Sequence, residues 1–313
     1  MLTYLIILLD DTSVSFCHYD VPEGERRLMP LDVLRRGIVW AMKENVNVQF
    51  VYPDYPLPQE YNELIETIDH TKIKPEAQAE GADVAVLTEW KSRIADSADH
   101  ATCIIHASRQ ELAVNMGKVK LLIGKAARVN VVLTDTEVFT DKDADSYKQT
   151  LDAMADRIIE LYLQGGNPQL NILTDRLSIG HMNNCGAGDT SLTLAPDGKL
   201  YVCPAFYYDK QEAIGDVESG VKIGNAQLLH LDHAPICSHC DAFQCKRCIW
   251  LNQKTTLEVN TPSHEQCVAA HLERNASKPL LEHLRSHGNF FPKTADINEI
   301  DFLDPFENKD KWQ

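Results

Sequence analysis

Seven cysteines in the C-terminal half of the chain have the types and spacing of a metal-binding scaffold. Four of them form two close pairs, Cys237 with Cys240 and Cys245 with Cys248, and four residues separate the pairs. Pairs at such short range bring four thiolates onto one loop, and thiolates are the ligands that soft metals select. The pattern therefore predicts a zinc or iron–sulfur site. The other members of the set are Cys185, Cys203 and Cys267.

Zinc and iron–sulfur clusters make different demands on such a set. One structural zinc ion is satisfied by four ligands, and zinc ribbons usually separate their two pairs by about 15–20 residues. Here the separation is four residues, and one zinc ion would leave three cysteines without a role. A [4Fe–4S] cluster takes four thiolates, so two clusters take up to eight. Iron–sulfur ligation is therefore the favoured interpretation, and a structural zinc site is the alternative.

Charge and hydropathy narrow the class of protein. The formal net charge of -16 argues against a nucleic-acid partner, because binding to phosphates needs a basic face. Residues 1–11 contain a short apolar run without a basic segment before it or a small-residue cleavage site after it, which favours a buried strand over a signal peptide. No apolar stretch approaches the roughly 18 residues that span a bilayer, so no membrane partner is expected. We expect a cytoplasmic protein, in which clustered cysteine pairs indicate metal binding or redox work.

The elements that must position these cysteines begin with an alternating pattern in the first half. Apolar segments predict six strands, at residues 2–10, 46–52, 82–90, 101–108, 128–136 and 169–175. Apolar residues at helical spacing predict three helices, at residues 30–43, 110–127 and 143–164. This βαβα order predicts an α/β fold with a parallel sheet covered by helices, either a partial (β/α) barrel or an open doubly wound sheet.

The pattern changes near residue 183, where short strands, turns and the cysteines begin. Residues 192–203 predict a hairpin, because two alternating apolar segments flank the turn residues Pro196, Asp197 and Gly198. We therefore expect three parts: an α/β domain at 1–180, a small cysteine-rich domain at 181–288, and a polar tail at 289–313.

Written in order, the cysteine set contains one further regular feature. Twelve residues separate Cys185 from Gly198, four more precede Cys203, and the last cysteine follows the paired block after 18 residues. This order resembles the seven-cysteine SPASM domain at the C-terminus of many radical SAM peptide-modifying enzymes, over about 85 residues. The spacings inside the paired block are one residue shorter than in the usual family pattern.

The resemblance implies two auxiliary [4Fe–4S] clusters with interleaved ligands. One would be held by a complete set of four: Cys237, Cys240, Cys245 and Cys267. The other would be held by Cys185, Cys203 and Cys248. Only three cysteines match for that second cluster, so one iron would stay open or take another ligand, such as His181 or Asp189.

The resemblance to radical SAM enzymes also shows what the N-terminal half lacks. Their chemistry needs Cys-x3-Cys-x2-Cys after the first strand, where residues 10–19 contain the single cysteine Cys17. The other spare cysteine, Cys103, lies in an apolar segment and is expected in the core. A Gly-Gly-Glu turn usually follows the second strand of the family, but residues 52–57 have a different sequence. S-adenosylmethionine is therefore not expected as a cofactor.

This combination resembles the CXXX repeat peptide maturase family over most of the chain, including residues 49–61 and 234–252. The resemblance implies maturation of a ribosomally synthesised cysteine-repeat peptide, with auxiliary clusters that bind substrate or relay electrons. It implies two partners, the precursor peptide and a separate radical SAM enzyme. Whether the chain is itself a maturase or only a maturase subunit stays open. The alternative is a zinc-stabilised module that binds a peptide or protein without redox chemistry.

Two further pairs could do chemistry. Asp10 and Asp11 end the first expected strand and could bind a cation, although a turn or helix cap is the favoured interpretation. Cys17 and His18 could form a nucleophile and its neighbour, but adjacent residues on a strand point to opposite faces. His239 lies between the first paired cysteines, where it could ligate metal or remain in a solvated loop.

Overall fold

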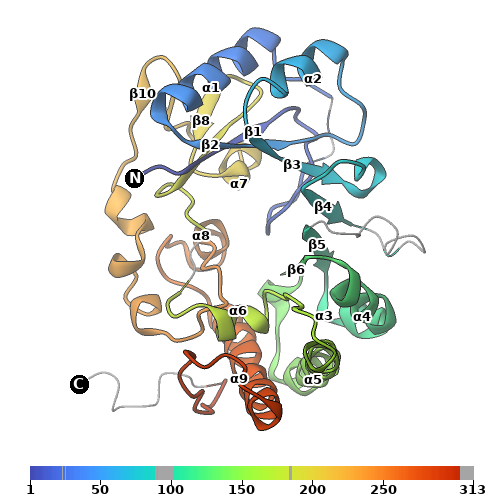
Figure 1. The fold of residues 1–313 in the computed structure, drawn as a ribbon. Coiled ribbons are helices and arrows are strands. Elements are labelled where there is room, and N and C mark those ends of the chain that lie inside the picture. The colour runs from blue at the N-terminus through green and yellow to red at the C-terminus, as the bar shows by residue number, and fades with distance from the viewer. Residues whose placement is uncertain (23, 25, 89, 91–101, 183–184, 304–313) are drawn as a thin grey trace. The chain divides into compact units, whose positions relative to one another are not determined.

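The computed structural model describes residues 1–22, 24, 26–88, 90, 102–182 and 185–303. The chain forms two compact units that alternate along the sequence, and Figure 1 traces their elements in chain order. Unit 1 consists of Met1–Thr88 and Gly186–His230, and unit 2 of Glu89–Cys185 and Leu231–Gln313. The domain boundaries expected near residues 180 and 288 remain a prediction. Within the described ranges, no helix has both the length and the apolar composition needed to cross a membrane.

Unit 1 contains the parallel sheet that the first half of the sequence predicts. Its parallel strands follow chain order: β1 (Tyr4–Leu8), β2 (Asn47–Val51), β3 (His70–Pro75) and β4 (Val84–Leu87). The apolar residues of β1 are buried on both faces, as is usual when helices cover a parallel sheet. The strand β3 was not among the expected strands, because its sequence is mostly polar.

The predicted hairpin extends this sheet on the other side of β1. The strand β7 (Ser191–Leu194) pairs with β1 in parallel, and β8 (Lys199–Tyr201) pairs with β7 in the antiparallel direction. Gly198 closes the turn with a φ of +81°, a conformation that favours glycine. Two short strands, β9 (Gly215–Asp216) and β10 (Gly220–Val221), complete this edge.

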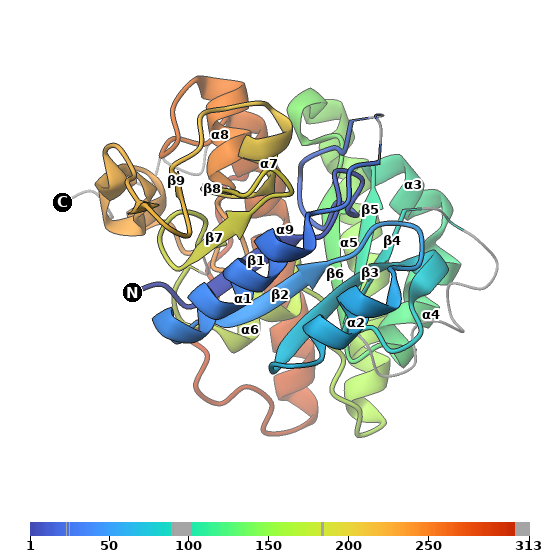
Figure 2. The same cartoon turned by 90° about the horizontal axis from the view of Figure 1, so that it is seen from above.

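Helices bury the core of unit 1. Figure 2 shows α1 (Leu31–Glu44) and α2 (Gln59–Ile65) lying over the face of the sheet that β1, β2 and β3 form. The helix α1 approaches β7 closely at Gly37, where an added Cβ would lie 2.3 Å from a methyl carbon of Leu194. A short helix, α7 (Pro204–Tyr208), follows the hairpin.

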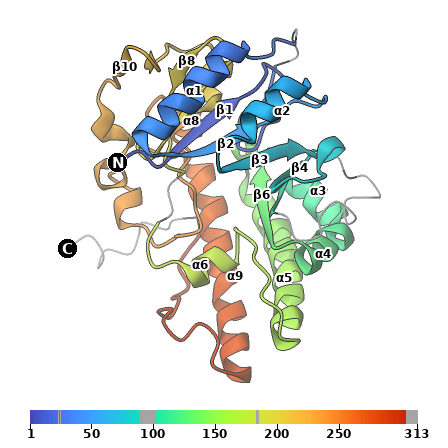
Figure 3. The ribbon, with the colours of Figure 1, turned by 45° about the horizontal axis from the view of Figure 1, so that its top comes forward.

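Unit 2 is built from two parallel strands and several helices. The strands β5 (Thr102–Ala107) and β6 (Arg128–Leu133) are joined by α3 (Arg109–Val114) and α4 (Met116–Lys125). The remaining helices are α5 (Asp141–Leu163), α6 (Thr174–Ser178), α8 (Ile249–Thr256) and α9 (His264–His287). Figure 3 shows the two long helices, α5 and α9, packed side by side.

Five 3-10 helices occur among the described residues of the two units. They are Glu76–Gln78, Thr136–Val138, Ala226–Leu229, Leu231–His233 and Cys237–His239.

Two expected elements of unit 2 differ from the structure. The strand expected at 169–175 is wrong, because this segment makes a single bridge at Leu170 and then enters α6. The Asn171 side chain takes the place of a strand ladder, accepting from the Val131 nitrogen at 2.8 Å and donating to the Val131 oxygen at 2.9 Å. The helix expected at 110–127 is two helices, separated at Asn115.

Candidate functional site

The paired cysteines lie on an irregular loop of unit 2. The loop contains the 3-10 helix Cys237–His239 and ends where α8 begins at Ile249. Cys267 is supplied by the first turn of α9, whose start is capped by the Ser263 hydroxyl accepting from the Gln266 nitrogen at 3.3 Å. The same compact unit therefore contains all members of the expected four-cysteine set.

Three of these four thiols have raised pKa values to which other members of the set contribute. Burial raises the pKa of the Cys245 thiol well above its ordinary value, and the Cys237, Cys240 and Cys267 thiols raise it further. Burial also raises the pKa of Cys267 to about 12, with Cys237 and Cys240 adding to the effect. For Cys237 the pKa rises to about 11, by burial first and then by Cys240. Cys237 and Cys240 thus lie within electrostatic range of both Cys245 and Cys267.

This grouping has a direct chemical consequence. Metal ligation requires thiolates, and buried neighbouring thiols hold their protons at neutral pH. Only a positively charged centre among them offsets the cost of four negative charges, so binding would release protons. Metal ligation by these four cysteines therefore remains a prediction of the sequence.

Ion pairs hold the cysteine loop next to α9 and α6. Asp241, which directly follows Cys240, accepts from Arg274 Nε at 2.7 Å and from Arg274 Nη2 at 2.6 Å. Arg176 approaches the same carboxylate at 3.4 Å and stacks over the Phe243 ring at 4.6 Å. Arg274 is 1% exposed, so this bidentate pair fixes the loop to a buried point of α9.

A second buried network joins α9 to α5 and to the cysteine loop. Glu273 accepts from the Tyr147 hydroxyl of α5 at 2.8 Å, and burial raises the pKa of the Glu273 carboxyl to about 7. Hydrogen bonds from Tyr147 and Gln244 act in the opposite direction and lower that pKa. The Gln244 amide also donates to the Ala270 oxygen at 2.6 Å. Through Gln244, which lies between the two cysteine pairs, the loop is joined to this network.

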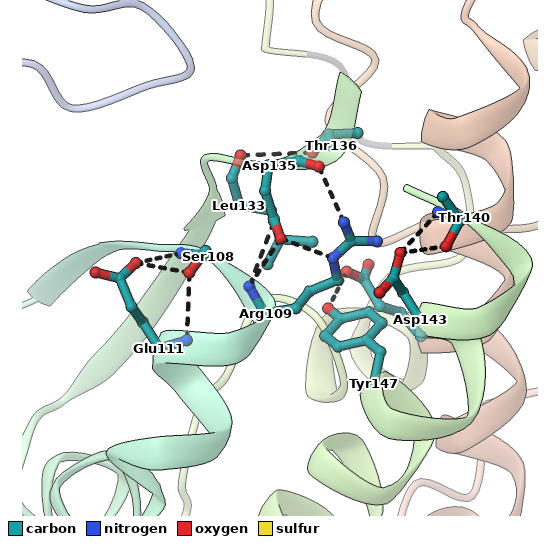
Figure 4. A network of polar contacts seen from close by, with 10 residues as sticks. Ser108, Arg109, Glu111, Leu133, Asp135, Thr136, Thr140, Asp143 and Tyr147 are labelled. Atoms are coloured by element: carbon teal, nitrogen blue, oxygen red, sulfur yellow. Dashed lines mark hydrogen bonds and ion pairs between the residues drawn. The ribbon is translucent and has the colours of Figure 1, made fainter. Parts of the chain in front are cut away.

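The same region of α5 faces a polar cluster at the carboxyl ends of β5 and β6 (Figure 4). Arg109 Nε donates to Asp135 at 3.0 Å, Nη2 donates to the Asp135 backbone oxygen at 3.0 Å, and the guanidinium lies 4.0 Å from the Phe139 ring centre. Capping boxes at Ser108–Glu111 and Thr140–Asp143 begin α3 and α5 on either side. These contacts fix α3 and α5, and through α5 they support the position of α9.

The expected three-cysteine set is divided between the units. In unit 2, burial raises the pKa of the Cys248 thiol to about 12 and Cys185 raises it further, while the Cys185 nitrogen donates to the Lys246 oxygen at 3.1 Å. Cys203 belongs to unit 1, at the start of α7. Of the two other proposed ligands, His181 is exposed and Asp189 lies 3.4 Å from His230.

Among the described residues, no three or more His, Cys, Asp or Glu side chains form a group that could hold a metal ion. The two expected kinds of centre differ in the spacing that they need. Zinc ligands converge on one ion, whereas each thiolate of a [4Fe–4S] cluster binds its own iron and is held apart by the cluster.

The loop after β1 in unit 1 has a different character. Asp10 is fully buried and accepts from the Thr12 nitrogen at 2.8 Å, the Thr12 hydroxyl at 2.7 Å and the Tyr55 hydroxyl at 2.6 Å. Asp11 accepts from Arg27 Nε at 2.9 Å and from the Tyr207 hydroxyl. Donors of the protein surround both carboxylates, which supports the turn interpretation over a cation site.

Cys17 lies in the same loop, near a group of aromatic rings. Tyr19 stacks on Tyr208 with ring centres 5.4 Å apart and meets the edge of Phe16 at 5.9 Å. Burial raises the pKa of Tyr19 well above its ordinary value, and Tyr208 and Cys17 raise it further. The loop that would hold three cysteines in a radical SAM enzyme is therefore filled by aromatic packing.

Sequence reasoning missed several residues that surround the cysteine loop, above all His271 and Asp241. His271 Nε2 lies 3.5 Å from Cys240 Sγ, and the Ala242 nitrogen donates to the same sulfur at 3.4 Å. The signal for His271 was present in the sequence, because Cys267 and His271 are four residues apart and face the same side of a helix. It was missed because the helix itself was not predicted.

Comparisons with known proteins bear on the fold. No protein-family model and no curated protein matches the sequence. Among solved structures, the chain is similar to hexahistidine-tagged anSMEcpe with bound AdoMet, with a TM-score of 0.62 and 13% identity, covering 91% of this chain and 99% of that chain. Native anSMEcpe with bound AdoMet and the Kp18Cys peptide gives a TM-score of 0.60 at 14% identity, covering 90% and 99%.

A third similar structure is Streptococcus suis SuiB bound to the precursor peptide SuiA, with a TM-score of 0.50 and 12% identity, covering 83% of this chain and 74% of that chain. At these identities the similarity concerns the fold. The expected α/β class with a parallel sheet is thereby confirmed.

Proposed function

We propose that the chain is an iron–sulfur protein that acts in the maturation of a ribosomally synthesised, cysteine-repeat peptide. The observation that supports this proposal is the electrostatic coupling among the four thiols of the cysteine loop and the first turn of α9, in which Cys237 and Cys240 raise the pKa values of both Cys245 and Cys267. Neighbouring neutral thiols can bind a metal centre, which replaces their protons and stabilises the resulting thiolates.

The peptide part of the proposal is supported by the structural neighbours. Two of them were solved with peptides, anSMEcpe with Kp18Cys and SuiB with its precursor peptide SuiA. A fold that accepts peptides in those proteins supports a peptide substrate here. The cysteine-repeat character of that peptide is the finer proposal, and it rests on the sequence resemblance to CXXX repeat peptide maturases.

The ligands of the first cluster would be Cys237, Cys240, Cys245 and Cys267. Such a closed thiolate set supplies electron transfer or structural support. Cys185, Cys203 and Cys248 would serve a second cluster that lacks a fourth cysteine. A cysteine-rich peptide could supply the missing thiolate there, as a substrate occupies the open position of a catalytic zinc site.

S-adenosylmethionine needs separate treatment. The lone Cys17 does not provide the three thiolates that reductive cleavage requires, so we propose that a partner radical SAM enzyme generates any adenosyl radical. The anSMEcpe structures contain AdoMet, which argues weakly against excluding it as a ligand of this chain. Binding and cleavage should therefore be measured as two different properties.

The experiment that tests the function uses two synthetic peptides with the full chain, purified without oxygen. One contains Cys-x-x-x repeats, and its matched control has serine at every cysteine. We expect the cysteine peptide to bind in calorimetry and to perturb the visible absorption, and the serine peptide to leave the spectrum unchanged. Equal binding of both peptides with no spectral change would favour a peptide-binding module, and binding of neither would contradict the proposed function.

A further inference from the structure

His271 lies beside the cysteine loop in a geometry that fixes the role of each ring nitrogen. It is on α9, one turn after Cys267, and 3% of it is exposed. Its Nδ1 is 2.7 Å from the Cys267 backbone oxygen, and because a carbonyl oxygen only accepts, Nδ1 carries the proton. In the neutral imidazole, Nε2 then presents its lone pair, and Nε2 is the atom 3.5 Å from Cys240 Sγ.

This is the arrangement in which proteins hold ligating histidines. A ligating ring usually donates its other N–H to a carbonyl or carboxylate, which fixes the tautomer and the ring direction. The separation of 3.5 Å is a hydrogen-bond distance for a sulfur partner, so the Cys240 thiol donates to the Nε2 lone pair. The two donors therefore reach the same point, and a cluster iron, which has one outer ligand position, would bind one of them at a time.

Another histidine of α9 shows that the backbone hydrogen bond alone is not informative. His287 Nδ1 makes the same contact with the oxygen four residues earlier, that of His283, at 3.0 Å. That ring is exposed and stacks on the His283 ring. What distinguishes His271 is its burial and the direction of Nε2 towards a thiol of the four-cysteine group.

We propose that His271 is a metal ligand that serves the same iron position as Cys240, an inference that rests on the proposed iron–sulfur function. The site then offers five donors for four irons, and Cys240 is its exchangeable thiolate. In the exchange the iron–Sγ bond breaks and an iron–Nε2 bond forms, and Cys240 takes a proton from solvent. No electron is transferred, and the bound centre becomes one unit less negative.

The proposal predicts unequal effects of removing single cysteines. Cys240→Ala should keep nearly all the iron of the four-thiolate cluster, because His271 replaces the lost ligand. Cys237→Ala should lose that cluster, since no such imidazole contact is found for its sulfur among the described residues. Cys240→Ala combined with His271→Ala should lose it as completely as Cys237→Ala does.

The test measures iron and acid-labile sulfide per chain, together with pulsed electron paramagnetic resonance of the reduced full-length protein labelled with [¹⁵N]histidine. We expect a strong ¹⁵N coupling in Cys240→Ala that is absent from the double variant. His239→Ala is the matched control, because His239 is exposed within the same cysteine pair and its removal should change neither readout. His271→Gln removes the ring nitrogens but keeps a polar side chain. Circular dichroism spectra of every variant then show whether a loss of iron reflects a lost ligand or a lost fold.

Three outcomes overturn the proposal. Cys240→Ala could lose as much iron as Cys237→Ala, it could keep iron without a ¹⁵N coupling, or its cluster could survive in the double variant. In each of these cases the wild-type protein still contains iron, so the proposed function stands while the role of His271 fails. A wild-type protein without iron would instead contradict both.

Discussion

The reactive side chains of the loop after β1 in unit 1 and of the cysteine loop in unit 2 have different kinds of neighbours. In the first, Asp10 and Asp11 receive hydrogen bonds from threonine, tyrosine and arginine side chains of the same unit. In the second, burial raises the pKa values of the Cys245 and Cys267 thiols, and the Cys237 and Cys240 thiols raise both further. The carboxylates of the first loop are stabilised by donors of their own unit, whereas several thiols of the second lie where burial and neighbouring thiols disfavour the thiolate.

The charged residues of the cysteine loop sharpen this contrast. Asp241 is directed to Arg274 and Arg176, so its carboxylate anchors the loop to the helices of unit 2. The acidic group nearest in sequence to Cys240 is thus engaged in positioning the loop. A difference in bonding partners therefore separates a structural loop from a candidate ligand loop.

The largest expected effect comes from breaking the cysteine loop directly. Replacing both Cys240 and Cys245 with alanine should remove about four irons per chain, one cluster's complement, and lower the melting temperature, because ligation and folding of this region are coupled. Colorimetric iron analysis and calorimetry measure both effects. Cys103→Ala is the control, because Cys103 is fully buried in β5 and should retain all iron. Full iron and unchanged melting in the double variant would refute the ligand assignment.

A smaller effect is expected from the buried carboxyl beside the loop. Because the folded-state pKa of Glu273 is raised to about 7 from 4.5, the unfolded chain ionises first as pH rises. The contribution of Glu273 to the stability of the wild type should therefore fall between pH 4.5 and 7, by about 3 kcal/mol at most.

Glu273→Gln should lack that fall. Anaerobic urea unfolding at pH 5 and pH 8 measures the difference, with Glu299→Gln as an exposed control. Parallel pH dependence in wild type and Glu273→Gln would contradict the burial argument.

The next prediction concerns the loop after β1, where protein donors surround the carboxylate of Asp10. Tyr55→Phe removes one donor from the buried Asp10 carboxylate and should destabilise the fold by about 1–3 kcal/mol. Iron content should stay at the wild-type level, because the loop after β1 has no ligand role in this account. Loss of iron in Tyr55→Phe, with the fold intact by circular dichroism, would remove the contrast between the two loops.

The last prediction is that the protein does not cleave S-adenosylmethionine. Incubation of the protein with a strong reductant and S-adenosylmethionine should yield no more 5′-deoxyadenosine than a sample without enzyme. A separate calorimetric titration measures whether the compound binds. Production of 5′-deoxyadenosine that disappears in Cys17→Ser would show that the loop after β1 is catalytic.

Much of unit 1 could be predicted from the sequence, because its signals are local. Buried parallel strands appear as apolar runs, as β1 does, and the turn at Gly198 has its own residue signature. By contrast, β3 is mostly polar and was missed. The segment at 169–175 was wrongly expected to be a strand, since the side chain of Asn171 replaces strand pairing.

The candidate site was predictable in its cysteines but not in its surroundings. Spacing alone indicates a thiolate group. The approach of α9 could not be predicted, because Pro279 lies inside that helix and proline usually ends one. Without α9, sequence reasoning cannot place His271 beside Cys240 or Arg274 beside Asp241. These contacts join elements about 30 residues apart, and only the folded chain shows them.

The most direct test of the central claim is the visible spectrum and metal content of the full chain purified without oxygen. The account predicts a brown protein with broad absorption near about 400 nm that bleaches on reduction, and iron and sulfide in equal amounts. Cys237→Ala should lose part of both. A colourless protein with stoichiometric zinc, or one without metal after reconstitution with iron and sulfide, would contradict the account.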